Sequence, residues 1–196
     1  MPKVTEQYRE AKRDEIAEAA LRCFAKKGFG ASMADIISDT GLSAGAIYGH
    51  FESKHEVMLA VSRLIMASRI HDLEALYALE RAAAPSEVLS RVLTGLARDV
   101  GDPGLLLQVW GRSIVETGMR SIVWEVFGEL RNAYRRLFAA WAAQNRGLDE
   151  TQALEWAEDL IPVAIGLAQG YIAQSALFPE FDGPAYLASV HELLPH

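Results

Sequence analysis

The chain has a single cysteine, Cys23, among its 196 residues. One thiol cannot form a disulfide within the chain, and a free cysteine usually packs as a small apolar side chain. Cys23 lies next to the helical stripe of Ile16, Ala20 and Phe24. We therefore expect a buried packing role for this thiol rather than a redox role.

Signals for β-strands are nearly absent. No run of β-branched residues alternates with polar residues between turns, and few of the 7 prolines fall inside periodic segments. Apolar residues make up 51% of the chain, which is typical of a globular protein rather than a disordered one. The predicted fold class is all-α.

The sequence also lacks the common patterns of catalytic sites. No carboxylates are paired on one helix face, no cysteines and histidines have metal-ligand spacing, and no glycine-rich loop could cradle a phosphate. His71 and Glu116 could form an acid–base pair only on paper, because nothing in their spacing supports it. We expect no enzyme activity, no cofactor and no bound metal.

Residues 160–178 contain no charged side chain and approach the length of a membrane span. It contains Pro162, Gln169 and Gln174, and its flanks are acidic, whereas a membrane helix normally has Lys or Arg on its cytoplasmic side. We therefore expect no membrane partner. Residues 1–13 are charged throughout, so we expect no signal peptide and a cytoplasmic location.

The net charge of -7 is unevenly distributed. Residues 1–57 carry 8 basic and 9 acidic side chains, whereas residues 58–196 carry 11 arginines and 17 acidic side chains. All five lysines lie at or before Lys54. The first part can bind DNA if its cations converge on one face, and the acidic remainder argues against indiscriminate binding of nucleic acid.

The most informative segment covers residues 31–58. Ser32 is followed three residues later by Asp35, a capping pattern that predicts the start of a helix. Gly41 is suited to end that helix in a left-handed conformation. Ser43 then caps a second helix, predicted over residues 44–51. A turn of this length and chemistry is typical of a helix-turn-helix.

This segment resembles the tetracycline-repressor (TetR) family of bacterial transcription regulators. The similarity covers residues 10–60. The matching positions are Ile16, Ala20, Phe24, Gly28-Phe29-Gly30, Ser32, Asp35-Ile36, Gly41-Leu42-Ser43, Gly45-Ala46-Ile47-Tyr48, His50-Phe51 and Ser53-Lys54. The resemblance implies a three-helix helix-turn-helix DNA-binding domain over residues 1–53 and a helical ligand-binding and dimerisation domain over residues 54–196, with about nine helices in all.

The family further implies a ligand-responsive regulator, a repressor, that binds a palindromic operator as a homodimer. A small hydrophobic or aromatic effector would release it from double-stranded DNA. A regulator of the same fold that is switched by a protein partner is the alternative. Effector identity, operator sequence and regulated genes are not readable from this sequence.

Several residues of the helix-turn-helix have the chemistry needed for DNA contact. Serines at helix starts suit phosphates, small residues permit close approach and methyl contacts with thymine, and Tyr48, His50 and Lys54 can reach a phosphate or a base edge. The predicted DNA-binding residues are Ser32, Ser43, Ala44, Gly45, Ala46, Tyr48, His50 and Lys54. The alternative is purely structural: capping for the serines, packing for Tyr48 and His50, and solvation for Lys54. Further phosphate contacts could come from Lys3, Arg9, Lys12 and Arg13.

The helix predicted over residues 149–178 is apolar on more than one face, so it must be buried nearly all round. One face can serve the core of this chain, and the other requires a second chain. Glycines four residues apart would let another helix approach closely, and the last short helix could complete the interface. The dimer candidates are Ala164, Gly166, Gly170, Ala173, Tyr186 and Val190.

All four tryptophans lie in the second part of the chain. A small-ligand site needs a mostly apolar cavity with a few polar anchors, although each polar residue could instead be an ordinary core or surface residue. The effector-binding candidates are His71, Trp110, Ser113, Glu116, Phe127, Asn132, Tyr134 and Gln169. The aromatic content favours a bulky apolar effector, and Glu116 weakly favours a cationic one.

Overall fold

The computed structural model describes residues 6–28, 30–100 and 102–196, apart from the side chains of residues 66–68. Lys3 and Phe29, which the sequence analysis singled out, lie outside the described residues. Within the described ranges the chain forms nine α-helices and no strand, which confirms the all-α prediction. The helices are α1 (Glu6–Lys27), α2 (Met33–Thr40), α3 (Ala44–Tyr48), α4 (Lys54–Tyr77), α5 (Pro85–Val100), α6 (Gly104–Val115), α7 (Thr117–Arg146), α8 (Glu150–Leu177) and α9 (Gly183–Leu193).

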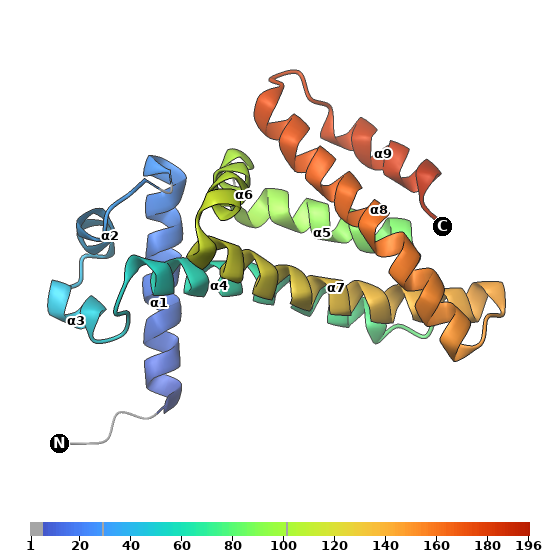
Figure 1. Ribbon diagram of the computed structural model, residues 1–196, viewed down its shortest axis with the longest axis horizontal. Coiled ribbons are helices and arrows are strands. Elements are labelled where there is room, and N and C mark those ends of the chain that lie inside the picture. Colours follow the sequence, from blue (N-terminus) through green and yellow to red (C-terminus); the bar gives the residue numbers. More distant parts are fainter. Residues whose placement is uncertain (1–5, 29, 101) are drawn as a thin grey trace.

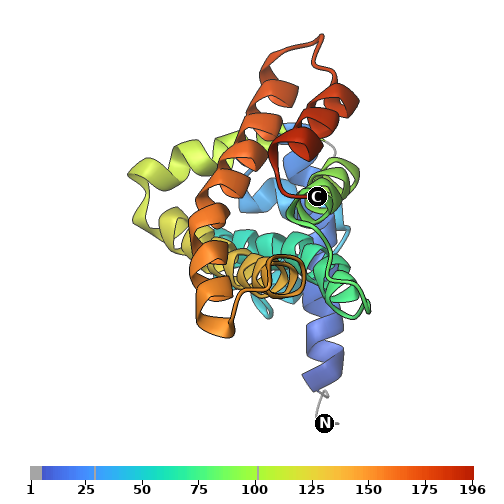
Figure 2. The ribbon, with the colours of Figure 1, turned by 90° about the vertical axis from the view of Figure 1, so that its right-hand side faces the viewer.

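The helices form a small group at one end of the molecule and a larger group at the other (Figure 1). Helices α1, α2 and α3 make up the small group, and α4 leads from it into the larger one. There α7 runs beside α4, and α8 crosses over α7 (Figures 1 and 2). Helix α9 folds back along α8 and also contacts α5.

Capping residues determine where the helices of the helix-turn-helix begin and end. Ser32 and Asp35 form a reciprocal capping box at the start of α2, with the Asp35 N–H donating to Ser32 Oγ at 3.2 Å. Gly41 ends α2 at a φ of 67°, which a side chain would disfavour. Ser43 then caps α3 by accepting a hydrogen bond from the Ala46 N–H. These three features were all predicted.

Helix α3 is shorter than the predicted range of residues 44–51. It ends at Tyr48, because the N–H groups of His50 and Phe51 both donate to the Ile47 carbonyl. The chain then turns toward α4, which Ser53 caps by accepting from the Glu56 N–H at 3.3 Å.

Side chains also satisfy backbone groups at two further helix starts. Helix α5 begins at Pro85, and the Glu87 carboxylate in its first turn accepts a hydrogen bond from the Ala84 N–H at 3.0 Å. Helix α7 begins at Thr117, and the Arg120 side chain donates hydrogen bonds to the Ser113 and Ile114 carbonyls at the end of α6.

The first hydrophobic core joins the helix-turn-helix to the larger helical group. It contains residues of α1, α2 and α3 together with residues of α4, α6 and α7. Cys23 is fully buried in it, which confirms the packing prediction, and burial raises the pKa of its thiol. This core contains residues from both sides of residue 53. The division into a DNA-binding domain over residues 1–53 and a regulatory domain over residues 54–196 therefore remains a prediction about function.

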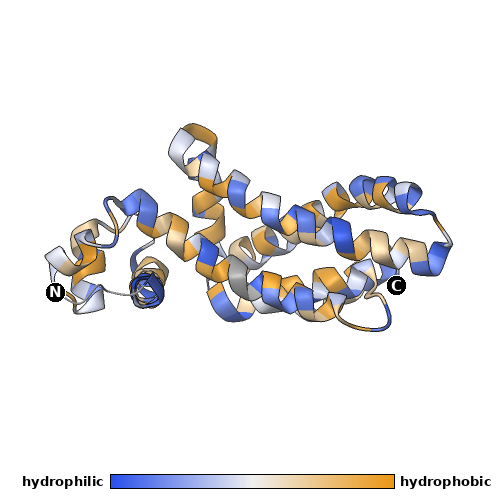
Figure 3. Ribbon diagram, turned by 90° about the horizontal axis from the view of Figure 1, so that it is seen from below, coloured by the Kyte–Doolittle hydropathy of each residue, from blue (hydrophilic) through white to orange (hydrophobic). Residues whose placement is uncertain are grey.

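A second core lies among α4, α5, α7, α8 and α9. Figure 3 shows hydrophobic and hydrophilic residues on different parts of most helices. Helix α8 is long and apolar enough, by length and composition, to cross a membrane, a property that core helices of soluble proteins share. However, only 17% of an 18-residue apolar stretch of α8 is buried within this chain. Much of the apolar surface of α8 is therefore left uncovered.

Candidate DNA interface and ligand cavity

The short helix α3 presents its small and aromatic residues outward. Ala44, Gly45 and Ala46 are exposed, and Tyr48 is 51% exposed. A Cβ atom placed on Gly45 would meet no other group within 4 Å, so this part of the surface is open. Ile47, in contrast, is fully buried in the first core. The helix is thus held from behind while its outer face stays accessible.

Three helix starts, those of α2, α3 and α4, carry further predicted DNA-binding residues. Ser32 and Ser43 are exposed, and both act as caps of their helices. Lys54 is the first residue of α4 and is half-buried. Burial and the nearby Arg112 lower the pKa of the Lys54 ammonium. An anion placed beside Lys54 would offset both effects, which is what a DNA phosphate would do.

His50 lies between α3 and the basic face of α1. It is half-buried rather than fully exposed. The Arg13 guanidinium donates a hydrogen bond to the His50 carbonyl and lies over the Phe51 ring. Burial, followed by the positive charges of Arg9, Arg13 and Lys12, lowers the pKa of the imidazole. The basic side chains of Arg9, Lys12 and Arg13 therefore lie close to His50 near the end of α3.

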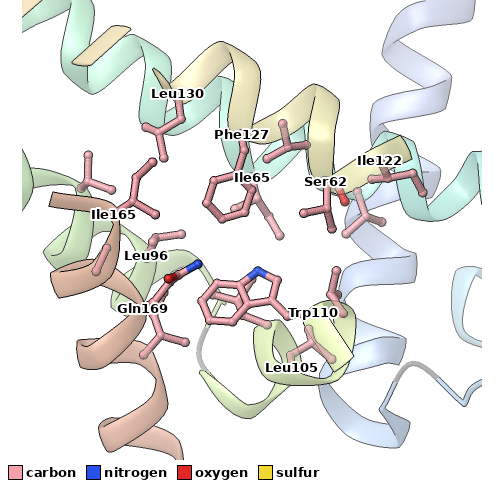
Figure 4. A pocket seen from close by; sticks show the side chains of 18 of the residues that line it. Ser62, Ile65, Leu96, Leu105, Trp110, Ile122, Phe127, Leu130, Ile165 and Gln169 are labelled. Carbon is pink, nitrogen blue, oxygen red and sulfur yellow. The ribbon is translucent and has the colours of Figure 1, made fainter. Parts of the chain in front are cut away.

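A separate cavity of about 100 Å³ lies in the larger helical group. Its walls come from α4, α5, α6, α7 and α8, and nearly all of the lining side chains are apolar. Phe127 points from α7 toward Trp110 of α6, and the Gln169 amide lies beside the Trp110 ring (Figure 4). The two aromatic rings are 6.4 Å apart between centroids and are inclined by 53°.

Four effector-binding candidates line this cavity: Trp110, Phe127, Tyr134 and Gln169. The other four lie outside it. His71 and Glu116 are exposed, and the Ser113 hydroxyl donates to the Trp110 carbonyl at 2.7 Å. Asn132 is exposed, because it is two residues from both Leu130 and Tyr134 on α7 and so faces the other side of the helix.

No sequence pattern pointed to the α4 and α5 residues of the cavity. Val61, Ser62 and Ile65 contribute from α4, and Val92 and Leu96 contribute from α5. In the sequence these residues form ordinary apolar stripes, which are the same for a packed core and for a cavity wall. Their role depends on how far apart the helices lie.

The residues of the helix-turn-helix match a known family. A model of the bacterial regulatory proteins of the tetR family matches residues 16–61 of this chain. This segment contains α2, α3 and the capping residues described above. This segment, residues 16–61, belongs to the TetR family.

Curated TetR-type relatives match over part of their length. The chain is 32% identical over 108 residues to an uncharacterised helix-turn-helix regulator of Bacillus subtilis, YfiR, covering 52% of this chain and 50% of that protein. It is 41% identical over 64 residues to the transcriptional repressor AcnR of Corynebacterium diphtheriae, covering 32% of this chain and 34% of that protein. The chain thus spans about a third to a half of these relatives.

Solved structures share the fold over nearly the whole chain. A TetR transcription regulator from Haloarcula marismortui has a TM-score of 0.76 at 11% identity, covering 95% of this chain and 99% of that one. A transcriptional regulator from Saccharomonospora viridis in complex with choline has a TM-score of 0.67 at 22% identity, covering 92% and 94%. At these identities the likeness extends to the TetR fold alone.

The predicted dimer residues fall into two groups. Ala164 and Val190 are buried in the second core of the same chain, so their side chains have no surface to offer a partner. Gly166 is exposed, and a Cβ atom there would meet nothing within 4 Å. Gly170, Ala173 and Tyr186 are half-buried.

Gly170 is in close contact with the chain's own last helix. A Cβ atom on Gly170 would lie 2.7 Å from the Tyr186 hydroxyl, which donates to the Leu167 carbonyl at 2.8 Å. The glycine therefore makes room for α9 of the same chain. Close approach by a helix of another chain, as the sequence suggested, is better suited to Gly166.

Proposed function

We propose that this TetR-family protein is a transcriptional regulator, a repressor, that binds a palindromic DNA operator as a homodimer. The observation that carries the proposal is the outer face of α3, where Ala44, Gly45, Ala46 and Tyr48 are exposed on a helix anchored by Ile47. A short helix of this kind fits the major groove. Phosphates would bind at the starts of α2, α3 and α4, with Ser32, Ser43 and Lys54.

Sequence reading by α3 would depend on few hydrogen bonds. Its residues 44–48 include no Arg, Asn or Gln, the side chains that make the common bidentate contacts with bases. The alanine methyls can touch thymine methyls, Tyr48 can contact a base edge or a phosphate, and His50 can do the same as a neutral group. Much of the specificity would then come from the shape of the operator.

A homodimer would explain the uncovered apolar surface of α8. Val163 and Leu177 of α8 and the adjoining Phe178 are each more than half exposed, and Gly166 leaves an open site between them for a second helix. Covering such surface contributes about 25 cal/mol for each Å² removed from water. Two linked reading heads would also bind two half-sites together, which raises the affinity beyond that of one short helix.

A small apolar or aromatic effector would occupy the cavity and weaken DNA binding. Val61, Leu105, Val109 and Ile122 line the cavity and also belong to the first core, which anchors Ile47. Helix α6 reaches the DNA-binding group as well, since a Cβ atom on Gly28 would lie 2.9 Å from Gln108 Oε1. A ligand that binds more tightly to one arrangement of these helices shifts the population toward it.

The alternative proposal is a regulator switched by a protein partner. In that case the exposed α6–α7 corner, with Ile114, Val115 and Trp124, would contact the partner, and ligands in the cavity would leave DNA affinity unchanged. Either regulator would work in the cytoplasm of a bacterium, without cofactor or catalysis.

The decisive experiment selects duplexes from a randomised DNA pool with the full chain and measures their affinity by fluorescence anisotropy. We expect a palindromic consensus, and Tyr48→Ala should weaken binding to it by roughly tenfold without a change in the urea midpoint. Tyr77→Ala, at an equally exposed tyrosine on α4 far from α3, is the control. Recovery of no consensus, or equal effects of the two variants, would overturn the DNA-binding proposal.

A further inference from the structure

Polar side chains that line the cavity include Ser62, Gln169 and Tyr134. Ser62 is already satisfied, because its hydroxyl donates to the Met58 carbonyl at 2.9 Å. Gln169 is exposed, so its amide remains in contact with water at the edge of the cavity. Tyr134 lines the same cavity and is 0% exposed, yet its hydroxyl has no hydrogen-bond partner.

An unpartnered buried hydroxyl is costly and uncommon in folded proteins, where buried polar groups are nearly always paired. Tyr134 follows Leu130 and Phe127 at helical spacing on α7, so its side chain lies on the face of α7 that borders the cavity. Its ring stacks on Phe138 with centroids 5.3 Å apart, which limits how far it can turn. A ligand oxygen within hydrogen-bond distance of this hydroxyl would satisfy it.

The charge state of a ligand is restricted as well. Among the described side chains that line the cavity, none is acidic or basic. Glu116, the residue that suggested a cationic effector, is exposed outside the cavity. An ion buried here would lose its hydration and gain no counter-ion, at a large cost in free energy. The rings of Trp110, Phe127 and Tyr134 would offset only part of this cost for a cation.

The size of the cavity indicates the scale of the ligand. An apolar cavity of about 150 Å³ in another protein holds benzene, and this one measures about 100 Å³. A one-ring or compact branched molecule therefore fits after a small movement of the walls. A larger molecule would have to separate α6 from α7 or α8.

We infer that the cavity binds an uncharged, one-ring or compact apolar molecule carrying one oxygen acceptor, and that the Tyr134 hydroxyl donates a hydrogen bond to that oxygen. Burial also raises the pKa of the Tyr134 hydroxyl, so it remains protonated and able to donate at every physiological pH. This inference rests on the proposed function, in which the cavity is the effector site, and it adds the chemical class of the ligand.

The test uses four probes of nearly the same planar shape: acetophenone, α-methylstyrene, benzoate and benzamidinium. The first has a carbonyl oxygen, the second replaces it with a methylene group, and the other two carry a negative and a positive charge. Calorimetric titration into the wild-type chain should detect binding of both neutral probes. The chain should bind the two ions at least tenfold more weakly. Equal or tighter binding of either ion, or no binding of any probe at millimolar concentration, would overturn the inference.

The Tyr134→Phe variant tests the hydrogen bond itself. It removes an unpartnered hydroxyl, so the fold should be as stable as before or more stable. Acetophenone should bind about three- to tenfold more weakly to the variant, as expected for one hydrogen bond, while the affinity of α-methylstyrene should stay the same or rise. Tyr171→Phe on α8, outside the described cavity lining, is the matched control and should change neither affinity. Equal weakening of both neutral probes by Tyr134→Phe would show that the hydroxyl does not donate to the ligand.

Release of the selected operator is measured separately with the same probes. Binding in the predicted order without release would leave the ligand class intact and overturn the effector response. Release by benzoate or benzamidinium, bound as tightly as acetophenone, would support the effector response and overturn the ligand class.

Discussion

The Arg13 guanidinium of α1 lies 4.2 Å from the centre of the Phe51 ring, just beyond α3. It also donates a hydrogen bond to the His50 carbonyl. One side chain therefore connects α1 to the segment that follows α3. This contact, made between residues 37 positions apart, fixes the direction in which the chain leaves α3.

Replacing Arg13 should loosen the end of α3. Arg13→Ala removes a cation–π contact and a hydrogen bond, so we expect a loss of about 1–2 kcal/mol in the free energy of unfolding. Operator affinity should fall as well. Arg13→Lys should recover part of the stability, because a lysine can lie over the ring but lacks the planar fork. Urea unfolding and anisotropy measure the two effects, and an unchanged stability in Arg13→Ala would contradict the proposed role.

His50 should make stability depend on pH. Its pKa is lowered in the folded chain by burial and by Arg9, Arg13 and Lys12. The unfolded chain takes up the proton near the usual pKa of 6.5, and the folded chain does so at a lower pH. The contribution of neutral His50 is therefore complete above about pH 6.5 and declines as the pH falls below that value.

The measurement is the urea midpoint of the wild type and of His50→Gln between pH 5 and pH 8. The difference between the two proteins should be constant in the upper part of this range. Below about pH 6.5 the wild type should lose stability faster than the variant. Parallel curves over the whole range would mean that the folded and unfolded chains bind the His50 proton equally well.

Gly95→Ala should be strongly destabilising. Arg69 is fully buried against α5, where it pairs with Asp72 at 3.1 Å and with Asp99. A Cβ atom on Gly95 would lie 1.0 Å from Arg69 Nη1, so the guanidinium would have to move away from its partners. Disrupting a buried ion pair costs about 3–5 kcal/mol.

The control for this substitution is Gly128→Ala on the exposed side of α7, where a Cβ atom would meet nothing within 4 Å. That change should stabilise the helix by about 0.5–1 kcal/mol. Urea unfolding distinguishes the two predictions, because the free energy of unfolding should fall in Gly95→Ala and rise in Gly128→Ala. A Gly95→Ala variant as stable as the wild type would mean that Arg69 can leave its site at little cost.

Two glycines of α8 should respond differently to substitution. Gly166→Glu places a charged side chain on open, exposed surface, so the chain should fold normally and sediment as a monomer. Gly170→Ala forces the Tyr186 hydroxyl to move, so it should reduce stability by about 1–2 kcal/mol through lost packing against α9. Sedimentation velocity and urea unfolding distinguish the cases. A Gly166→Glu variant with the same sedimentation coefficient as the wild type would exclude this face of α8 from a dimer interface.

The features that could be predicted from the sequence depend on residues close together in the chain. The Ser32–Asp35 capping box, the left-handed Gly41 and the Ser43 cap act within about four residues, so their chemistry determines the helix-turn-helix wherever it is placed. The same holds for Asp149, which caps α8 through a capping box with Gln152. For this reason both the TetR resemblance and the all-α fold could be recognised from the sequence alone.

Tertiary packing decided the features that depend on distant residues. The contact of Arg13 with Phe51 requires α1 to lie beside the segment that follows α3. The cavity requires the faces of five helices to leave a gap, and the phase of each helix then separates Tyr134 from Asn132, two residues away. Apolar spacing specifies which side of a helix is buried, but the distance and angle between helices determine whether that side closes into a core or borders a cavity.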